Sequence, residues 1–300
     1  MEYLHYKVGG HRFTIAAPSR EAAIVFLSPY ESFEIRPADG EEPLFVLTLE
    51  PNPSFPLLPQ YTEIEWDDGY CTVGRDAEDY LFSLHPHGDE CTYTLYCSAH
   101  FRRCVMTFAP QHPNFTYALN SFLMLAYAFA TAPARTLLLH ASVVECGGKA
   151  YLFQGKSGTG KSTHSRLWLR VVKDAVLLND DNPIVRIEDG QVFVYGSPWS
   201  GKTPCYRNRR VPAGAFVRLV QAPENHIRLC RPAEAFASLL PSCSAMKWDK
   251  PLYDAVCESV SEVVQSVPTY RLECLPDEAA ARLCYQEITH DRSALFENRC

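Results

Sequence analysis

The sequence predicts an α/β protein in two parts: a β-rich α+β domain over residues 1–112, and an α/β domain with a mixed sheet over residues 113–300. Two observations predict this division. The first hundred residues are short apolar runs separated by turn signals, whereas the second half alternates strand-like and helix-like segments. A length of 300 residues suits one large or two modest domains, at about 100–200 residues per domain.

Turn signals divide the first part into strands. Three pairs of strands are expected, each separated by a glycine-containing turn, at residues 4–8 with 12–16, 61–66 with 70–74, and 80–84 with 92–97. Pro18-Ser19 marks the start of a helix over residues 20–27. Five prolines between Pro43 and Pro59 indicate a loop around one strand at 44–49. This part carries no motif that indicates a chemistry.

An apolar helix at residues 115–131 is predicted to open the second domain. Residues 113–134 contain no charged side chain, and 22 residues are enough to cross a bilayer. Asn114, Asn120 and Thr131 interrupt the apolar character, and no cluster of Lys or Arg flanks the segment. The pattern therefore favours a buried core helix over a membrane span.

Strands and helices alternate through the rest of the second domain. Strands are expected at residues 137–145, 150–154, 175–178, 184–187, 192–195, 215–220, 227–231 and 269–274. Helices are expected at residues 161–172, 233–240, 252–267 and 277–287. No internal repeat or low-complexity tract is present.

A glycine-rich loop connects the strand at 150–154 to the helix at 161–172. Its sequence, Gly155-Lys156-Ser157-Gly158-Thr159-Gly160-Lys161-Ser162, fits the phosphate-binding pattern G-x-x-x-x-G-K-[ST] without deviation. Glycines let successive backbone N–H groups converge on phosphate oxygens, and the helix that follows adds its positive end. Lys161 is expected to reach the β- and γ-phosphates, and the Ser162 hydroxyl is placed for Mg²⁺. The nucleotide-binding residues predicted are Gly155, Ser157, Gly158, Thr159, Gly160, Lys161, Ser162 and Thr163.

A pair of acidic residues follows the next apolar strand. Asp180 and Asp181 come directly after residues 175–179, about twenty positions beyond the loop. An acid at the end of such a strand commonly holds Mg²⁺, and a second acid can act as general base toward a hydroxyl nucleophile. Asp180 is therefore the predicted metal ligand, together with Ser162, and Asp181 the predicted base.

Three further side chains are candidates for the same site. His140 ends the apolar run 137–139, which indicates partial burial near the loop. Residues 201–210 hold four basic side chains and no acidic one, and either form a solvated loop or neutralise phosphate charge. Lys202 and Arg207 are the catalytic candidates from this segment, with Arg209 as a further cation.

The charge of the chain is unevenly distributed. The net charge is −7, but residues 1–134 carry 7 basic and 17 acidic side chains, whereas residues 135–300 carry 21 and 18. This balance argues against a nucleic-acid-binding protein. Twelve cysteines without a C-x-x-C pair, and a start that lacks the pattern of a signal peptide, predict reduced thiols and a cytoplasmic location.

The ordered set His140-Ala141-Ser142, Gly155 to Ser162, and Asp180-Asp181 resembles the HPr kinase/phosphorylase catalytic domain and the wider phosphoenolpyruvate-carboxykinase-like phosphate-loop superfamily. The resemblance covers about half the chain, residues 137–287. It implies a mixed-sheet kinase-like domain that uses ATP and Mg²⁺, with His140 contacting the reacting phosphate, and a homo-oligomer, as related kinases often form. The R-G-x-G stretch of true HPr kinases is absent, and the first half does not resemble their regulatory domain.

These observations predict an ATP- and Mg²⁺-dependent phosphotransferase acting on a hydroxyl, such as a serine of a protein or peptide. Two alternatives remain open. One is an ATP-binding regulatory module that recruits a partner through its acidic half without transferring phosphate. The other is carboxykinase-like chemistry on a small acid.

Overall fold

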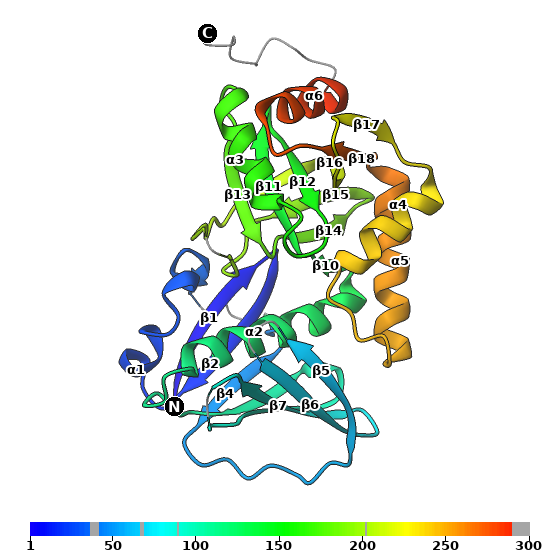
Figure 1. Cartoon of the computed structure of the whole chain (residues 1–300). Helices are drawn as coiled ribbons and strands as arrows, with labels where there is room; N and C mark the ends of the chain where they lie inside the picture. The colour runs from blue at the N-terminus through cyan, green and yellow to red at the C-terminus, as the bar shows by residue number, and fades with distance from the viewer. Residues whose placement is uncertain (37–41, 67–68, 89, 202, 290–300) are drawn as a thin grey trace. The chain divides into compact units, whose positions relative to one another are not determined.

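The computed structural model describes residues 1–36, 42–66, 69–88, 90–201 and 203–289. It is an α/β structure with two mixed sheets, and it divides into two compact units, Met1–Thr131 and Ala132–Cys300. Figure 1 shows both units, and each is described by itself.

The first unit is a nine-stranded sheet in the order β3-β1-β2-β4-β9-β8-β7-β6-β5. Its strands are β1 (Glu2–Val8), β2 (His11–Ala17), β3 (Glu34–Ile35), β4 (Val46–Glu50), β5 (Gln60–Trp66), β6 (Gly69–Asp76), β7 (Asp79–Pro86), β8 (Tyr93–Cys97) and β9 (Arg103–Thr107). The three predicted strand pairs form antiparallel ladders, β1 with β2, β5 with β6, and β7 with β8. Strand β9 was not predicted, and it joins β4 to β8 in the middle of the sheet.

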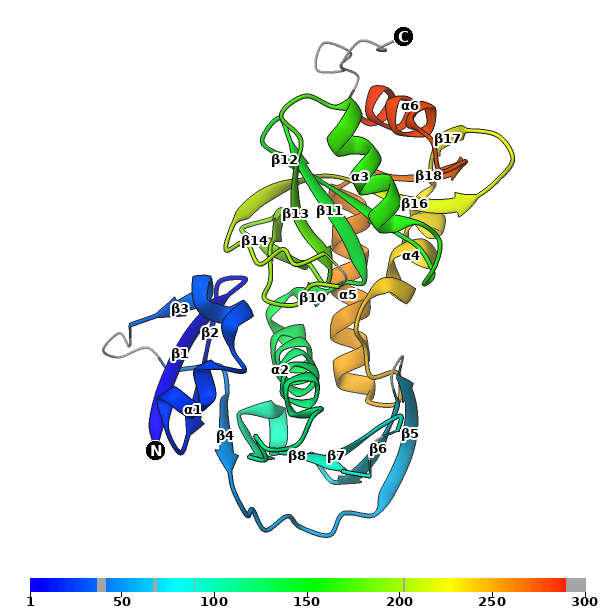
Figure 2. The ribbon, with the colours of Figure 1, turned by 60° about the vertical axis from the view of Figure 1, so that its left-hand side comes forward.

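Helix α2 (Phe115–Thr131) belongs to the first unit, so the predicted domain boundary at 112/113 is corrected to 131/132. Most of its residues are buried, because the sheet curves around it (Figure 2). Its Tyr127 hydroxyl donates to the carbonyl of Val8 at 2.9 Å, and Phe129 packs against Phe101. By length and composition alone, Phe115–Ala134 is the one segment in the described ranges that could cross a membrane, and 72% of an 18-residue apolar window within it is buried inside the structure.

One short helix and three 3₁₀ segments complete the connections of the first unit and the start of the second. Helix α1 (Arg20–Ile24) begins where the Ser19 hydroxyl accepts a hydrogen bond from the backbone N–H of Ala22, as the Pro18-Ser19 signal predicts. The 3₁₀ turns are η1 (Ser28–Phe33), η2 (Ala99–Phe101) and η3 (Ala132–Ala134).

The second unit is a sheet covered by helices on both faces (Figures 1 and 2). Its strands are β10 (Thr136–Leu138), β11 (Ala141–Cys146), β12 (Lys149–Gln154), β13 (Val176–Asp181), β14 (Ile184–Glu188), β15 (Gln191–Tyr195), β16 (Arg210–Gln221), β17 (His226–Leu229) and β18 (Thr269–Cys274). The order is β10-β14-β15-β16-β12-β11-β13, with β18 pairing to β16 and β17. β16 runs parallel to β12 and β18, and the remaining pairs are antiparallel.

Alternate side chains of the central strands serve two hydrophobic cores. Val143 and Leu152 face α4 (Pro232–Leu239) and α5 (Lys250–Ser266). Val144 and Phe153 face α3 (Lys161–Val171) and α6 (Glu278–Thr289). Because side chains alternate along a strand, neighbouring residues at the strand ends point to opposite helical layers.

The strand predicted at 137–145 is two strands in the structure. β10 pairs with β14, whereas β11 pairs with β12 and β13. The break falls at Leu139 and His140, whose backbones pair instead with the segment after η4 (Leu240–Ser242). His140 is therefore held directly before β11, beside the ends of β12 and β13.

Candidate functional site

The glycine-rich loop leaves the end of the buried strand β12 and enters α3. Gly158 and Gly160 have φ values of 77° and 104°, conformations that side-chain-bearing residues rarely adopt, and Gly160 directly precedes the first helical residue. A Cβ at Gly158 or Gly160 would meet no atom within 4 Å, so open space adjoins both residues. The loop thus has the strand–loop–helix context and the backbone that a phosphate cradle requires.

Lys161 bonds back to the first residues of the loop. Its ammonium donates to the carbonyls of Gly155 at 3.1 Å and Lys156 at 3.4 Å, and the residue is buried. The Thr159 hydroxyl also donates to the carbonyl of Lys156, at 2.6 Å. These bonds turn the loop around the Lys161 cation, which is the charge that a bound phosphate group needs.

The register of three strands brings the other predicted residues to the same end of the sheet. Gln154, Ala141 and Asp181 occupy adjacent positions on β12, β11 and β13. Adjacent strands lie about 4.8 Å apart, so the backbone of Asp181 is about 10 Å from Gln154, where the loop begins. The sequence order alone did not show this proximity, because β11 lies between the two strands.

Asp181 and His140 are within hydrogen-bonding distance of each other. His140 Nδ1 lies 2.9 Å from Asp181 Oδ1, and the Asn182 amide donates to Asp181 Oδ2 at 2.8 Å. Both side chains of the His140–Asp181 pair are partly exposed, at 43% and 34%. The arrangement fixes the carboxylate while leaving the pair accessible to a substrate, as a group that moves protons requires.

The backbone of Asp181 is strained. Its φ is 140°, a conformation that favours glycine, and Gly201 lies so close that a Cβ added to it would be 3.2 Å from the Asp181 Cβ. The neighbouring backbone holds it there: the N–H of Gly201 and the hydroxyl of Ser200 both donate to the carbonyl of Asp180. Strained backbone conformations are concentrated at functional sites, where the surrounding structure over-determines them.

Asp180 points to the opposite layer from Asp181. It pairs in register with Ser142, whose hydroxyl contacts that of Ser165 on α3 at 2.6 Å. Asp180 is therefore on the α3 side, which also carries Lys161 and Ser162, whereas Asp181 and His140 lie on the α4 side. Asp180 is 4% exposed, and in the described part of the chain its carboxylate has no hydrogen-bond or ion-pair partner.

The predicted basic segment is only partly at this site. Arg209 pairs with Glu145, near the far end of β11 from Ala141, and Arg210 pairs with Glu188 at 2.7 Å. Both cations are therefore paired with acids of the fold, and of the two alternatives for this segment the pairing of Arg209 does not favour neutralisation of phosphate. Arg207 is exposed. Burial raises the pKa of the Cys205 thiol, and the positive charge of Arg207 opposes that rise. Lys202 lies outside the described residues.

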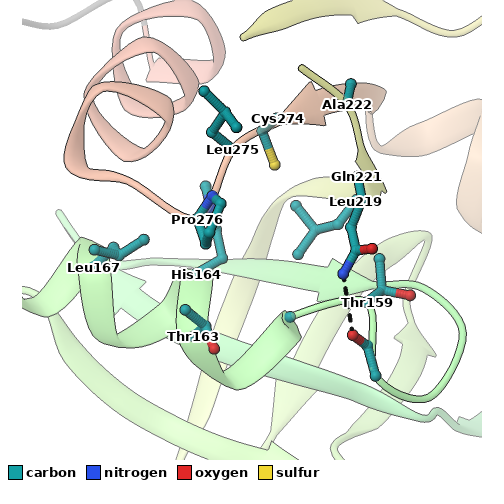
Figure 3. Close-up of a pocket in the computed structure, with 12 residues that line it drawn as sticks. Thr159, Thr163, His164, Leu167, Leu219, Gln221, Ala222, Cys274, Leu275 and Pro276 are labelled. Carbon is teal, nitrogen blue, oxygen red and sulfur yellow. Dashed lines mark hydrogen bonds between the residues drawn. The ribbon is translucent and has the colours of Figure 1, made fainter. Parts of the chain in front are cut away.

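A cavity of about 410 Å³ adjoins the loop on the α3 side (Figure 3). Its walls come from the loop, α3, the end of β16 and the β18–α6 connection, and include Thr163, Leu167, Leu219, Gln221, Leu275 and Pro276. The Gln221 amide donates to the carbonyl of Gly158 at 3.3 Å, which ties β16 to the loop. Sequence reasoning missed this cavity, because its walls come from three segments that are far apart in the sequence.

His164 on α3 is part of the cavity wall, and its buried imidazole is neutral. Its ring packs edge-to-face on Phe153, its Nε2 lies 3.2 Å from the indole nitrogen of Trp168, and burial lowers its pKa to about 4. Above that pH the buried imidazole is uncharged and can accept the indole N–H.

The stability of the wild type is expected to fall more steeply with acid than that of His164→Gln. An unfolded histidine titrates near 6.5, so between pH 6.5 and about 4 the unfolded state binds a proton that the folded state does not. Stability contributed by neutral His164 is present above pH 6.5 and is lost toward pH 4, whereas glutamine keeps an acceptor for Trp168 without titrating. Urea unfolding at pH 7.5 and 5.0 measures the two declines, and equal declines would contradict the assignment.

The fold and the site define an α/β protein with mixed sheets, in which a glycine-rich loop and an Asp–His pair meet at one end of a central sheet. No protein-family model matches the chain, and no curated protein matches it. Among solved structures, the HPr(Ser) kinase/phosphatase from Coxiella burnetii aligns with a TM-score of 0.30 and 14% identity, over 51% of this chain and 93% of that chain. Likeness at this level does not define a family for the chain.

Proposed function

We propose that the protein is an ATP- and Mg²⁺-dependent phosphotransferase that acts on a hydroxyl group, with a serine of a protein or peptide as the acceptor. The observation that carries the proposal is the meeting of the glycine-rich loop, Lys161 and the His140–Asp181 pair at one end of the second sheet. A loop that binds phosphate and a pair that moves protons are the two parts that phosphoryl transfer requires.

The loop and its neighbouring cavity fit a nucleoside triphosphate. Backbone N–H groups of residues 157–162 would bind the phosphates, with Lys161 supplying positive charge. The cavity lies beside the first turns of α3 and has room for a nucleoside, with apolar walls at Leu167 and Leu219 and the amide of Gln221 at its edge. Ser157 and Thr163, exposed on the loop and on α3, stand where they can contact the bound anion.

Asp180 and Ser162 fit a single Mg²⁺ ion. A buried carboxylate without a partner in the described chain is unfavourable unless a cation joins it. Among the described residues, no cluster of three or more Asp, Glu, His or Cys side chains could hold a metal ion by itself. Mg²⁺ bound to a nucleotide needs only one or two carboxylates beside the phosphates. When bound, the ion neutralises charge that develops on the transferring phosphoryl group.

The His140–Asp181 pair would prepare the acceptor. Asp181 takes the proton of the acceptor hydroxyl while the hydroxyl oxygen attacks the γ-phosphorus. The bond between the γ-phosphorus and the bridging oxygen breaks, and ADP leaves with the electron pair of that bond. His140 holds the Asp181 carboxylate toward the acceptor through the 2.9 Å contact, and its other ring nitrogen is able to contact the moving phosphoryl group. Lys161 stabilises the negative charge that remains on the nucleotide side.

Incubation with γ-labelled ATP, MgCl₂ and an extract of the source cell tests the proposal. The expected result is label on an acceptor that requires this protein and disappears with EDTA. Steady release of ADP with no labelled product in the presence of candidate partners would instead indicate the regulatory module, whose acidic first unit would recruit the partner. We propose a cytoplasmic setting, which is supported by the eleven described cysteines, since none of them forms a disulfide.

A further inference from the structure

Three arginines occupy adjacent positions across the sheet beside the candidate site. Arg218 on β16 pairs in register with Arg271 on β18, and Arg271 pairs with Arg228 on β17. The row continues in the other direction through Gln154 and Ala141 to Asp181. Residues directly opposite each other on neighbouring strands share a face, so the arginines, Gln154 and Asp181 lie on the α4 side of the sheet.

Two of the three arginines have carboxylate partners. Arg228 binds both oxygens of Glu234 on α4, and Arg271 pairs with Glu273 at 2.9 Å. Arg218 has no carboxylate partner among the described residues; its guanidinium donates to the carbonyl of Ser238 at 3.3 Å. A half-buried guanidinium beside two neutralised arginines retains an unbalanced positive charge.

Gln154, next to Arg218, has a side-chain oxygen that accepts no hydrogen bond. It is completely buried, its amide nitrogen lies 3.4 Å from the hydroxyl of Ser238, and its Oε1 has no hydrogen-bond partner. Buried amide oxygens in folded proteins are almost always bonded, so this one marks a place where a donor is expected. Ser238 thus links Gln154 and Arg218, immediately before the loop begins at Gly155.

The small residue Ala141 separates this cluster from Asp181. Arg218, Gln154, Ala141 and Asp181 span three strand spacings, about 14 Å between the outer backbones, and the side chains of Arg218 and Asp181 extend from the same face of the sheet. An acceptor whose hydroxyl is near Asp181 therefore has its next few atoms near Gln154 and Arg218.

We propose that Arg218 and Gln154 form a subsite for an anionic group of the acceptor, a carboxylate or a phosphate that lies a few bonds from the hydroxyl that receives the phosphoryl group. The guanidinium of Arg218 matches two oxygens of such a group, and Gln154 and Ser238 lie directly beside that guanidinium. This inference rests on the proposed function and adds the class of the acceptor to it. An acidic peptide and a small phosphorylated or carboxylated alcohol share this chemistry.

Transfer from γ-labelled ATP to matched acceptor pairs tests the subsite. One pair is a serine peptide with an adjacent Asp against the same peptide with Asn, and the other is glycerol 3-phosphate against glycerol. The wild type is expected to prefer the anionic member of at least one pair by about tenfold or more in kcat/KM, since hydrogen bonds to charged groups are the stronger ones. The pair that shows the preference identifies the source of the anion.

Arg218→Gln is expected to lower the ratio of kcat/KM between the anionic and the neutral acceptor toward one without changing the affinity for ATP. Arg218→Lys is expected to keep part of the preference. Arg271→Gln is the matched control, since its guanidinium already has Glu273, and should keep the wild-type preference. A preference that survives in Arg218→Gln, or an equal loss in Arg271→Gln, would overturn the proposal.

A binding measurement separates failure of the subsite from failure of the proposed function. Calorimetric titration of the full chain with inorganic phosphate uses Lys161→Ala as the background, so that the glycine-rich loop contributes little. We expect phosphate to bind in this background and to bind about tenfold or more weakly when Arg218→Gln is added. The absence of phosphate binding to the Lys161→Ala chain would refute the subsite even if ATP-dependent transfer is observed, and binding without any transfer would refute only the proposed function.

Discussion

Asp181→Asn is expected to lower phosphoryl transfer by about 10²–10⁴-fold while nucleotide affinity stays within about twofold of the wild type, which is the range that a general base contributes. The asparagine keeps the shape of the side chain and can still accept a hydrogen bond from His140, but it cannot take the acceptor proton. Single-turnover transfer from labelled ATP measures the first quantity, and titration with a fluorescent nucleotide measures the second.

Asp180→Asn is the matched control for this substitution. Asp180 lies on the α3 side with Ser162, so its loss should raise the Mg²⁺ concentration needed for half-maximal nucleotide binding, an effect that Asp181→Asn should not show. If the two variants weaken nucleotide binding equally, Asp181 does not have a role separate from the metal.

The contact between His140 and Asp181 admits a second assignment of the base. His140 binds Asp181 through Nδ1, so its Nε2 could take the proton while Asp181 only orients the ring. His140→Gln separates the two assignments: if Asp181 is the base, the variant keeps substantial transfer and the wild-type pH profile. Loss of transfer as large as that of Asp181→Asn, with nucleotide affinity unchanged, would give the role of base to His140.

The glycine-rich loop and the acidic pair could be predicted because their chemistry is contiguous in the chain. Gly155 to Ser162 encodes a loop whose backbone conformation depends on its own glycines, and the structure places Gly158 and Gly160 in the left-handed region as that pattern requires. That Asp180 and Asp181 face opposite layers also follows from strand alternation, once β13 is known to extend through both.

Arg218 and Gln154 could not be found in the same way, because their proximity depends on the pairing of β12 with β16, strands more than fifty residues apart. One local signal was present: Arg218 interrupts an otherwise apolar strand, and a charged residue there needs a partner or a ligand. Arg209 and Arg210 show the converse case: the sequence shows two cations in a basic segment, but not their acidic partners Glu145 and Glu188, which lie far away in the sequence.

The domain boundary was misplaced for a similar reason. Helix α2 is apolar on nearly every side, so its composition indicates burial without indicating which sheet buries it. Phe115 packs against Phe108 and Phe26, and Tyr127 against Phe13, all in the first unit. Only these tertiary contacts, and not the apolar composition, specify which sheet buries the helix.

Lys161→Ala is expected to weaken nucleotide binding by at least about tenfold and to abolish detectable transfer. The Lys161 ammonium is buried under the loop, where it bonds to the carbonyls of Gly155 and Lys156, so its charge is held at the place where the β- and γ-phosphates would bind. Its loss removes attraction for the bound phosphates and stabilisation of the charge that develops during transfer, and both the titration and the single-turnover assay above detect it.

Lys156→Ala is the control within the same loop. Lys156 is exposed and lies three residues before Thr159, near the start of the loop. Its charge therefore acts on a nucleotide mainly through solvent. Nucleotide affinity of this variant should remain within about threefold of the wild type, and that small effect should diminish as salt is raised. The effect of Lys161→Ala should persist at high salt, because a buried charge is screened much less than an exposed one. A Lys161→Ala protein that binds and transfers like the wild type would show that the loop is not the phosphate site.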